Sequence, residues 1–248
     1  MIKTVIYDLD DTLYDFHVVN QIADQNVQKE AERRFGEKGR DFLKVFATSY
    51  RAIGRYMPED VRVLQPENVD LAPVHSRTLR IAYTLEQLGL PVLPHTIELY
   101  DIYWGTILSL MQPEEHIREA LEGLKQRGIR IGIGTNMTSH IQYKKLIRLG
   151  LSDVVDFITV SEESIFDKPD VRFFARVLER SEASPEECLF VGDNYQNDYL
   201  GAKACGMNAL WYAKKEKPWN RLSSAQWEEA SATKEILLDH MDILQHLS

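Results

Sequence analysis

Val5-Ile6-Tyr7-Asp8-Leu9-Asp10-Asp11-Thr12-Leu13-Tyr14-Asp15 is the stretch that decides the fold, because an apolar, β-branched run ends there in carboxylates and a threonine. Buried parallel strands read as short continuous apolar runs, so we predict a strand over residues 3–9. Open α/β sheets bind ligands at the carboxyl ends of their strands, and the two-residue spacing lets Asp8 and Asp10 face the same side of that edge. An isolated acidic triplet is more often a solvated turn, so the rest of the chain must decide between the two interpretations.

Length and composition describe an ordinary globular protein. The chain has 248 residues, of which 44% are hydrophobic and 27% charged, and its net charge is −9. That charge argues against non-specific binding to nucleic acid or to a membrane surface. The first strand begins without a charged-then-apolar leader, and no apolar run reaches the length of a membrane span. With only two cysteines, Cys188 and Cys205, in apolar surroundings, we expect a cytoplasmic protein.

The pattern after the first strand is helical for about ninety residues, by the period of its apolar positions. Apolar stripes predict helices ending near Phe35, Ile53, Leu88 and Leu108, with an irregular segment from Met57 to Ala72. From Gln112 onward strands and helices alternate, as in a parallel sheet. The sequence therefore predicts a doubly wound, Rossmann-like parallel-sheet core over residues 1–14 and 109–248, with an α-helical cap domain inserted over residues 15–108.

Within that alternating part, local signals set the expected limits of the elements. Pro113 is expected to open a helix that ends at Gly128, and further helices are expected over 140–149, 170–180 and 197–205. Strands are expected over 129–134, 156–160, 188–192 and 209–212. Polar residues follow the ends of these strands: Thr135 and Asn136, then Lys168, then Asp193 with Asp198 five residues later. Each signal is weak alone, but all of them fall at one edge of the predicted sheet.

This ordered set resembles the haloacid dehalogenase-like hydrolase superfamily, in the subgroup with a helical cap after the first motif. The first motif, Asp-x-Asp-x-Thr, stands as Asp8 to Thr12, and the second is the apolar strand Ile131 to Thr135. The third is Lys168, and the fourth, Gly-Asp-x-x-x-x-Asp, is Gly192 to Asp198. The resemblance covers the whole chain. It implies a phosphatase that acts on a small phosphorylated metabolite and uses Mg²⁺.

The resemblance also implies a role for each motif residue. Asp8 would be the nucleophile that forms an aspartyl-phosphate, and Asp10 would protonate the leaving alcohol and then deprotonate water. Mg²⁺ would lie between Asp8 and Asp193, with the main-chain carbonyl of Asp10 as a further ligand. Lys168 and the Thr135 hydroxyl would hold the phosphoryl oxygens.

Three further residues receive supporting roles in this interpretation. Asn136 would add a backbone donor for the substrate, and Asp198 would orient Lys168 or metal-bound water. Thr12 would fix the loop after the nucleophile. Crowded carboxylates of this kind repel one another unless a cation lies among them, which favours the same hard, oxygen-seeking ion.

Other functions stay open at this stage. A 2-haloacid dehalogenase and a phosphomutase use the same fold, and a receiver-type signalling domain is also doubly wound with an acidic pocket, a threonine and a lysine. Against a receiver stand the helical insertion and the position of Asp193 and Asp198 after Lys168. The substrate is open between nucleotides and sugar phosphates, and the oligomeric state between monomer and homodimer.

Overall fold

The computed structural model describes residues 1–54, 75–213, 227–228, 231–232 and 235–247. The chain forms two compact units: an α/β unit, built from Met1–Asp15 and Gln112–Ser248, and a helical unit, Phe16–Met111. The sequence pattern predicted the boundaries between the two units after residue 14 and after residue 108. The second limit falls later in the structure because the last helix of the helical unit continues to Leu110. The predicted irregular segment from Met57 to Ala72 lies outside the described residues.

A six-stranded parallel sheet forms the centre of the α/β unit. Its strands are β1 (Thr4–Tyr7), β2 (Arg130–Thr135), β3 (Phe157–Val160), β4 (Cys188–Gly192), β5 (Asn208–Tyr212) and β6 (Ile236–Leu237). Their order is β3-β2-β1-β4-β5-β6, so β1 lies inside the sheet, with Thr4 paired to both Arg130 and Cys188. All four residues of β1 are buried, as expected for a continuous apolar strand covered on both faces.

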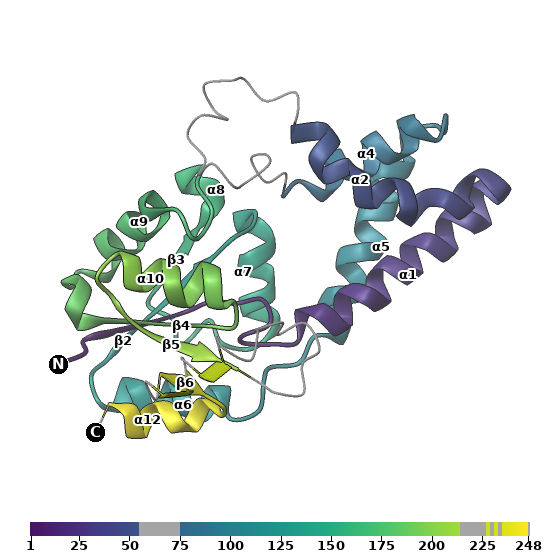
Figure 1. The fold of residues 1–248 in the computed structure, drawn as a ribbon. Helices are drawn as coiled ribbons and strands as arrows, with labels where there is room; N and C mark the ends of the chain where they lie inside the picture. Colours follow the sequence, from purple (N-terminus) through teal and green to yellow (C-terminus); the bar gives the residue numbers. More distant parts are fainter. Residues whose placement is uncertain (55–74, 214–226, 229–230, 233–234, 248) are drawn as a thin grey trace. The chain divides into compact units, whose positions relative to one another are not determined.

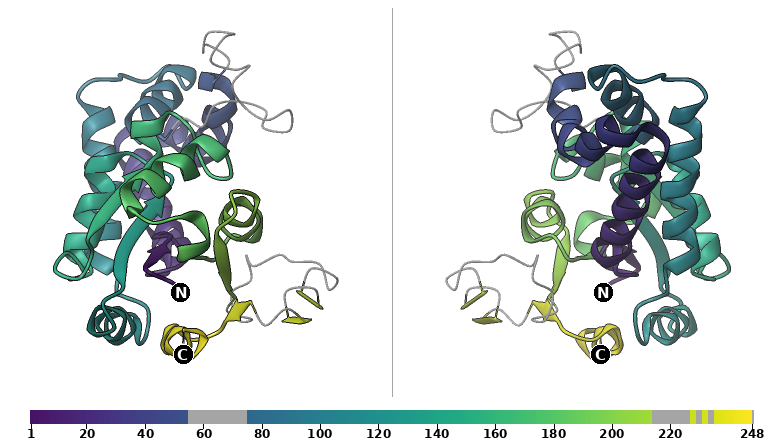
Figure 2. Two further views of the ribbon diagram at one scale, coloured as in Figure 1. Left: turned by 90° about the vertical axis from the view of Figure 1, so that its left-hand side faces the viewer. Right: turned by 90° about the vertical axis from the view of Figure 1, so that its right-hand side faces the viewer.

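Helices cover both faces of this sheet. They are α6 (Ile117–Gln126), α7 (Ser139–Arg148), α8 (Ser161–Ser164), α9 (Val171–Ser181), α10 (Gly201–Ala204) and α12 (Ile243–His246). Helices α6 and α12 lie side by side on one face, and α9 and α10 lie on the other (Figures 1 and 2). The prediction of a doubly wound parallel sheet is therefore confirmed.

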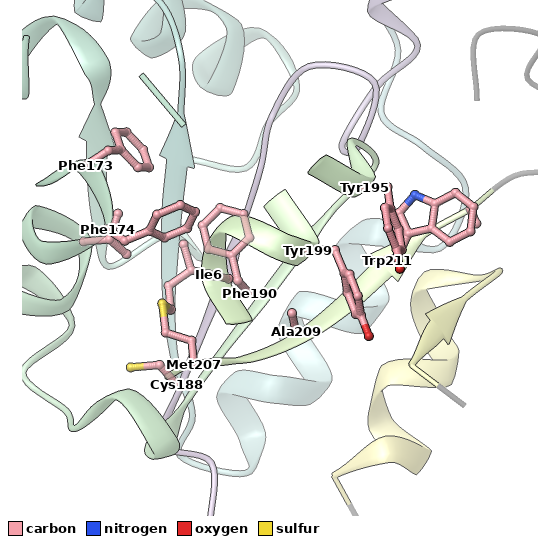
Figure 3. Packing of buried hydrophobic residues seen from close by; sticks show 13 residues of the cluster. Ile6, Phe173, Phe174, Cys188, Phe190, Tyr195, Tyr199, Met207, Ala209 and Trp211 are labelled. Carbon is pink, nitrogen blue, oxygen red and sulfur yellow. The ribbon is translucent and has the colours of Figure 1, made fainter. Parts of the chain in front are cut away.

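Aromatic side chains fill the core on the α9 and α10 side of the sheet. Figure 3 shows Phe174 of α9 directed toward Ile6 and Phe190 on the neighbouring strands β1 and β4. The ring centroids of Phe174 and Phe190 are 5.5 Å apart, and those of Tyr195 and Trp211 are also 5.5 Å apart. Both pairs meet edge to face, the geometry that aromatic quadrupoles favour. This packing fixes the strands whose ends carry the polar residues.

The structure differs from the prediction in three elements: one helix begins later, one strand was missed, and one helix is divided. Pro113 does not open a helix: it forms an isolated antiparallel bridge with Tyr14, and α6 begins at Ile117 after His116, whose φ is +60°. The short strand β6 was not predicted, because two residues carry too little periodicity to be recognised. The predicted helix over 197–205 is divided into a π-helical turn over Tyr195–Leu200 and the short α10.

The helical unit consists of α1 (Phe16–Phe35), a 3₁₀ turn (Gly36–Asp41), α2 (Phe42–Gly54), α4 (Arg77–Gln87) and α5 (His95–Leu110). Helices α1 and α5 pack along one another (Figure 1). The buried residues of α1 recur every four positions, namely Val19, Ala23, Val27 and Ala31. Gly36 ends this helix with a φ of +60°, which suits a residue without a Cβ.

Candidate active site

The carboxyl edge of the sheet holds a small polar cavity of about 180 Å³. It is lined by seven of the residues that the sequence singled out, namely Asp8, Asp10, Thr135, Asn136, Lys168, Asp193 and Asp198, together with Asp11, Asn194 and Asn197. They come from the ends of β1, β2 and β4 and from the segment after β3. The parallel order of the sheet is what brings residues so distant in sequence to one edge.

Lys168 is the centre of the buried charges in this cavity. Its Nζ donates to Asp8 Oδ1 over 2.6 Å and lies 2.7 Å from Asp198 Oδ1. The backbone amide of Asn194 donates to the other oxygen of Asp198 over 2.9 Å. Both oxygens of Asp198 are thus engaged, which fixes the ammonium group against Asp8. Burial disfavours the charged lysine, but Asp198 and Asp8 outweigh that effect and raise the pKa of Lys168.

Asn136 fixes the backbone at Lys168. Its side-chain oxygen accepts from the Lys168 amide over 2.9 Å, and its nitrogen donates to the Lys168 carbonyl over 3.4 Å. The side chain of Asn136 therefore holds the loop that carries the lysine. The predicted contact between a backbone donor of Asn136 and a substrate stays a prediction.

Asp193 is tied to the loop after β1 through Thr12. The Asp193 amide donates to Thr12 Oγ1 over 3.0 Å, and that hydroxyl donates to Asp193 Oδ1 over 3.3 Å. The indole of Trp211 donates to the Asp193 carbonyl over 2.7 Å. The backbone amide, the backbone carbonyl and the carboxylate of Asp193 are therefore all hydrogen-bonded.

The carboxylates of this cavity suit a divalent cation. Asp8, Asp193 and Asp198 each place one oxygen within 4.8 Å of the others. Burial raises the pKa of Asp8 to about 7, with Lys168 opposing the rise and Asp198 adding to it. Burial, followed by repulsion from Asp198 and Asp8, raises the pKa of Asp193 well above its ordinary value. A hard cation with oxygen ligands would relieve both penalties, so these residues fit Mg²⁺.

The carboxylate of Asp10 faces helix α7 and a nearby tyrosine. Its Oδ1 accepts from Tyr14 over 2.5 Å and from Lys145 over 2.6 Å, and its Oδ2 accepts from Gln142 over 3.1 Å. Burial raises the pKa of Asp10, but the charge of Lys145 and these hydrogen bonds outweigh it, so the pKa lies below its ordinary value. Sequence reasoning missed Lys145, Gln142 and Tyr14.

A larger cavity, of about 400 Å³, lies beside the edge strand β3. Its lining is mostly apolar, including Tyr143, Ile147 and Phe157, and it contains none of the predicted site residues. The chemistry-bearing groups gather in the smaller cavity instead.

Among the described residues, no helix has both the length and the apolar character that a bilayer crossing requires.

Comparison with known proteins identifies the family. The family model described as haloacid dehalogenase-like hydrolase matches residues 2–206. The chain belongs to the haloacid dehalogenase-like hydrolases. The resemblance that the four motifs carry is thereby confirmed.

Two members of this family with assigned activities are similar to the chain over most of its length. A ribulose-1,5-bisphosphate 5-phosphatase of Halopiger xanaduensis is 35% identical over 88% of this chain and 87% of its own. A glyceraldehyde 3-phosphate phosphatase of Methanothermobacter thermautotrophicus is 29% identical over 85% of each chain. Among solved structures, a 2-haloacid dehalogenase from Pseudomonas syringae superposes with a TM-score of 0.70 at 23% identity, covering 94% of this chain and all of the other. At that identity the likeness shows the fold alone.

Proposed function

We propose that this protein is a Mg²⁺-dependent phosphatase that hydrolyses small phosphate monoesters through an aspartyl-phosphate on Asp8. The observation that carries the proposal is the arrangement around Asp8, with Lys168 at 2.6 Å and the Asp193 carboxylate close enough to share a cation with Asp8. Phosphoryl transfer depends chiefly on positioning and on neutralising the charge of the phosphoryl oxygens. Relatives named as phosphatases support the assignment to phosphoric monoester hydrolases.

The protein's own side chains supply the nucleophile and the phosphoryl contacts. The carboxylate of Asp8 attacks phosphorus, and Lys168 and the Thr135 hydroxyl hold the phosphoryl oxygens. Asp198 and Asn136 act through Lys168, because one contacts its ammonium group and the other its backbone.

Proton transfer is assigned to Asp10. In the first step Asp10 gives its proton to the leaving alkoxide as the phosphorus–oxygen bond breaks. In the second step it takes a proton from the water that attacks the aspartyl-phosphate, which restores Asp8.

Asp8, Asp193 and the main-chain carbonyl of Asp10 would hold Mg²⁺, as the family pattern implies. The bound cation would neutralise negative charge on the transferred phosphoryl group. We assign the helical unit the role of the cap that selects the substrate. Because the similar enzymes are named for a sugar bisphosphate and a triose phosphate, we propose small sugar phosphates as the substrate class.

A metal-dependence experiment tests this function. Phosphate release should be measured for a panel of sugar phosphates, including ribulose-1,5-bisphosphate and glyceraldehyde 3-phosphate, with nucleoside monophosphates beside them. We expect activity with Mg²⁺, loss of activity in chelator, and recovery when Mg²⁺ is restored. Asp8→Asn should abolish turnover because the amide cannot form the acyl-phosphate, whereas the exposed Asp101→Asn should not change it. Full activity in chelator, or in Asp8→Asn, would reject the site.

A further inference from the structure

Two polar side chains on α7, Gln142 and Lys145, are fully buried in the structure. They lie three positions apart, so both project from one face of the helix. Burying an ammonium group and an amide costs several kcal/mol unless each is well paired. A helix that only covered the sheet would carry apolar residues at these positions, as it does at Ile141 and Leu146.

Lys145 fixes one oxygen of the acid–base carboxylate. Its Nζ lies 2.6 Å from Asp10 Oδ1, which also accepts from the Tyr14 hydroxyl. Two strong donors on the same oxygen, one of them charged, hold the carboxylate in one orientation. That orientation sets which protons Asp10 can reach.

Gln142 connects the other oxygen of Asp10 to the phosphoryl-binding hydroxyl. Its amide nitrogen donates to Asp10 Oδ2 over 3.1 Å and to Thr135 Oγ1 over 2.7 Å. A flipped amide would direct its oxygen at the Asp10 carboxylate, so the nitrogen faces these two acceptors. Since Thr135 accepts from Gln142, its own hydroxyl hydrogen is available for a phosphoryl oxygen.

We propose that Lys145 and Gln142 are positioning residues for this reaction, Lys145 by orienting Asp10 and Gln142 by fixing Asp10 and Thr135 relative to one another. The inference rests on the proposed function, since it assigns Asp10 the proton transfers and Thr135 a phosphoryl contact. Neither residue exchanges a proton with the substrate. Both act through the two groups they contact.

The first test replaces Lys145 by methionine, which keeps most of the side-chain volume and removes the ammonium group. We expect kcat for a sugar phosphate to fall roughly 10²-fold, toward the loss that removal of a general acid–base causes, with little change in KM. The loss should be smaller for p-nitrophenyl phosphate in the first step, because that leaving group needs no proton. Lys144→Met, at an exposed position of the same helix, should leave both substrates unaffected.

A double-mutant cycle with Asp10→Asn separates positioning from a general structural role. If Lys145 acts through Asp10, Lys145→Met should lower turnover by less than about threefold in the Asp10→Asn background. The same roughly 10²-fold loss in both backgrounds would overturn the proposal. If Lys145→Met does not fold, Gln142→Met replaces it in the cycle. A much smaller loss of turnover in the Asp10→Asn background then supports the proposal, and an equal loss in both backgrounds overturns it.

The controls also separate this inference from the proposed function. Wild-type protein that releases no phosphate from any ester would reject the function itself. Wild-type protein that is active, with a Lys145→Met loss that is equal for both leaving groups and independent of Asp10, would reject only the positioning role.

Discussion

At the scale of single residues, the proposed nucleophile, Asp8, lies in surroundings that oppose its negative charge. In the proposed mechanism Asp8 must be ionised to attack phosphorus, yet burial raises its pKa to about 7. Lys168 alone does not compensate, because Asp198 and Asp10 add negative charge nearby. A second cation would relieve this repulsion, so the proposed mechanism couples metal binding to the nucleophilicity of Asp8.

This balance predicts how the stability of the metal-free protein depends on pH. The folded-state pKa of Asp8, about 7, lies above the ordinary value of about 3.9, so between these pH values the folded state binds more protons. The stabilisation linked to Asp8 is therefore complete below about pH 4 and is lost as pH rises through 7. Urea midpoints in chelator should fall across this window. Asp8→Asn should flatten the fall, and an unchanged slope would contradict the assigned pKa.

The sequence revealed the residues to which we assign the chemistry, but not the residues that hold them in place. Asp8, Lys168 and Asp193 follow strands and are recognisable by their place at strand ends. Gln142 and Lys145 were missed because the sequence of their helix does not decide which of two faces is buried. Tyr143 and Ile147 are the more apolar residues, yet both are exposed, and Gln142 and Lys145 take the buried face.

At the scale of elements, the end of β4 meets the π-helical turn over Tyr195–Leu200 at very short range. A Cβ built on Gly192 would lie 2.3 Å from Asp198 Oδ2 and 2.6 Å from Asp198 Cβ. Only a residue without a side chain lets Asp198 approach β4 and reach Lys168.

Gly192→Ala should therefore displace Asp198 and loosen Lys168. We expect kcat/KM to fall on the order of 10²-fold, the cost of a misplacement of about 1 Å at a catalytic group. The matched control is Gly105→Ala on α5, where an added Cβ meets nothing within 4 Å. That variant should keep full activity and gain about 0.5–1 kcal/mol of stability, because alanine favours the helix. Normal activity of Gly192→Ala would argue against the role of Asp198.

The limits of helices and strands were predicted correctly where local sequence signals alone determine them. The strand Cys188–Gly192 is bounded as predicted, by the capping box at Ser184 and Glu187 on one side and Gly192 on the other. Pro113 carried an equally clear helix-start signal, but its pairing with Tyr14 keeps that segment extended. Contacts between segments distant in sequence are invisible to local patterns, and there the prediction was wrong.

At the scale of the whole molecule, the fold does not choose the reaction. The chain superposes well on a 2-haloacid dehalogenase, although the similar curated relatives are named as phosphatases. In the proposed mechanism the choice depends on Asp10, since an alkoxide leaving group needs a proton and a halide does not. The three donors around Asp10 hold its carboxylate in place and favour its ionised form, which suits the base that the second step requires.

We therefore expect no halide release from 2-chloropropionate under conditions in which phosphate esters are turned over. Ion chromatography for chloride and a colorimetric phosphate assay, on one enzyme preparation, measure both. A phosphomutase would retain its aspartyl-phosphate long enough for the sugar to exchange, so rapid release of inorganic phosphate distinguishes hydrolysis. Chloride release at a rate comparable to phosphate release would overturn the assignment.

The central place of β1 in the sheet has a consequence for synthesis on the ribosome. Thr4 pairs with Arg130 and Cys188, so β1 waits for partner strands that are made much later. At translation rates of roughly 5–20 residues per second, the interval is roughly 6–25 s for Arg130 and roughly 9–37 s for Cys188. The contiguous helical unit, Phe16–Met111, can complete its local contacts within this time. The apolar run Val5–Tyr7 lacks both partner strands during this time, and unpaired strand segments of this kind are prone to aggregate.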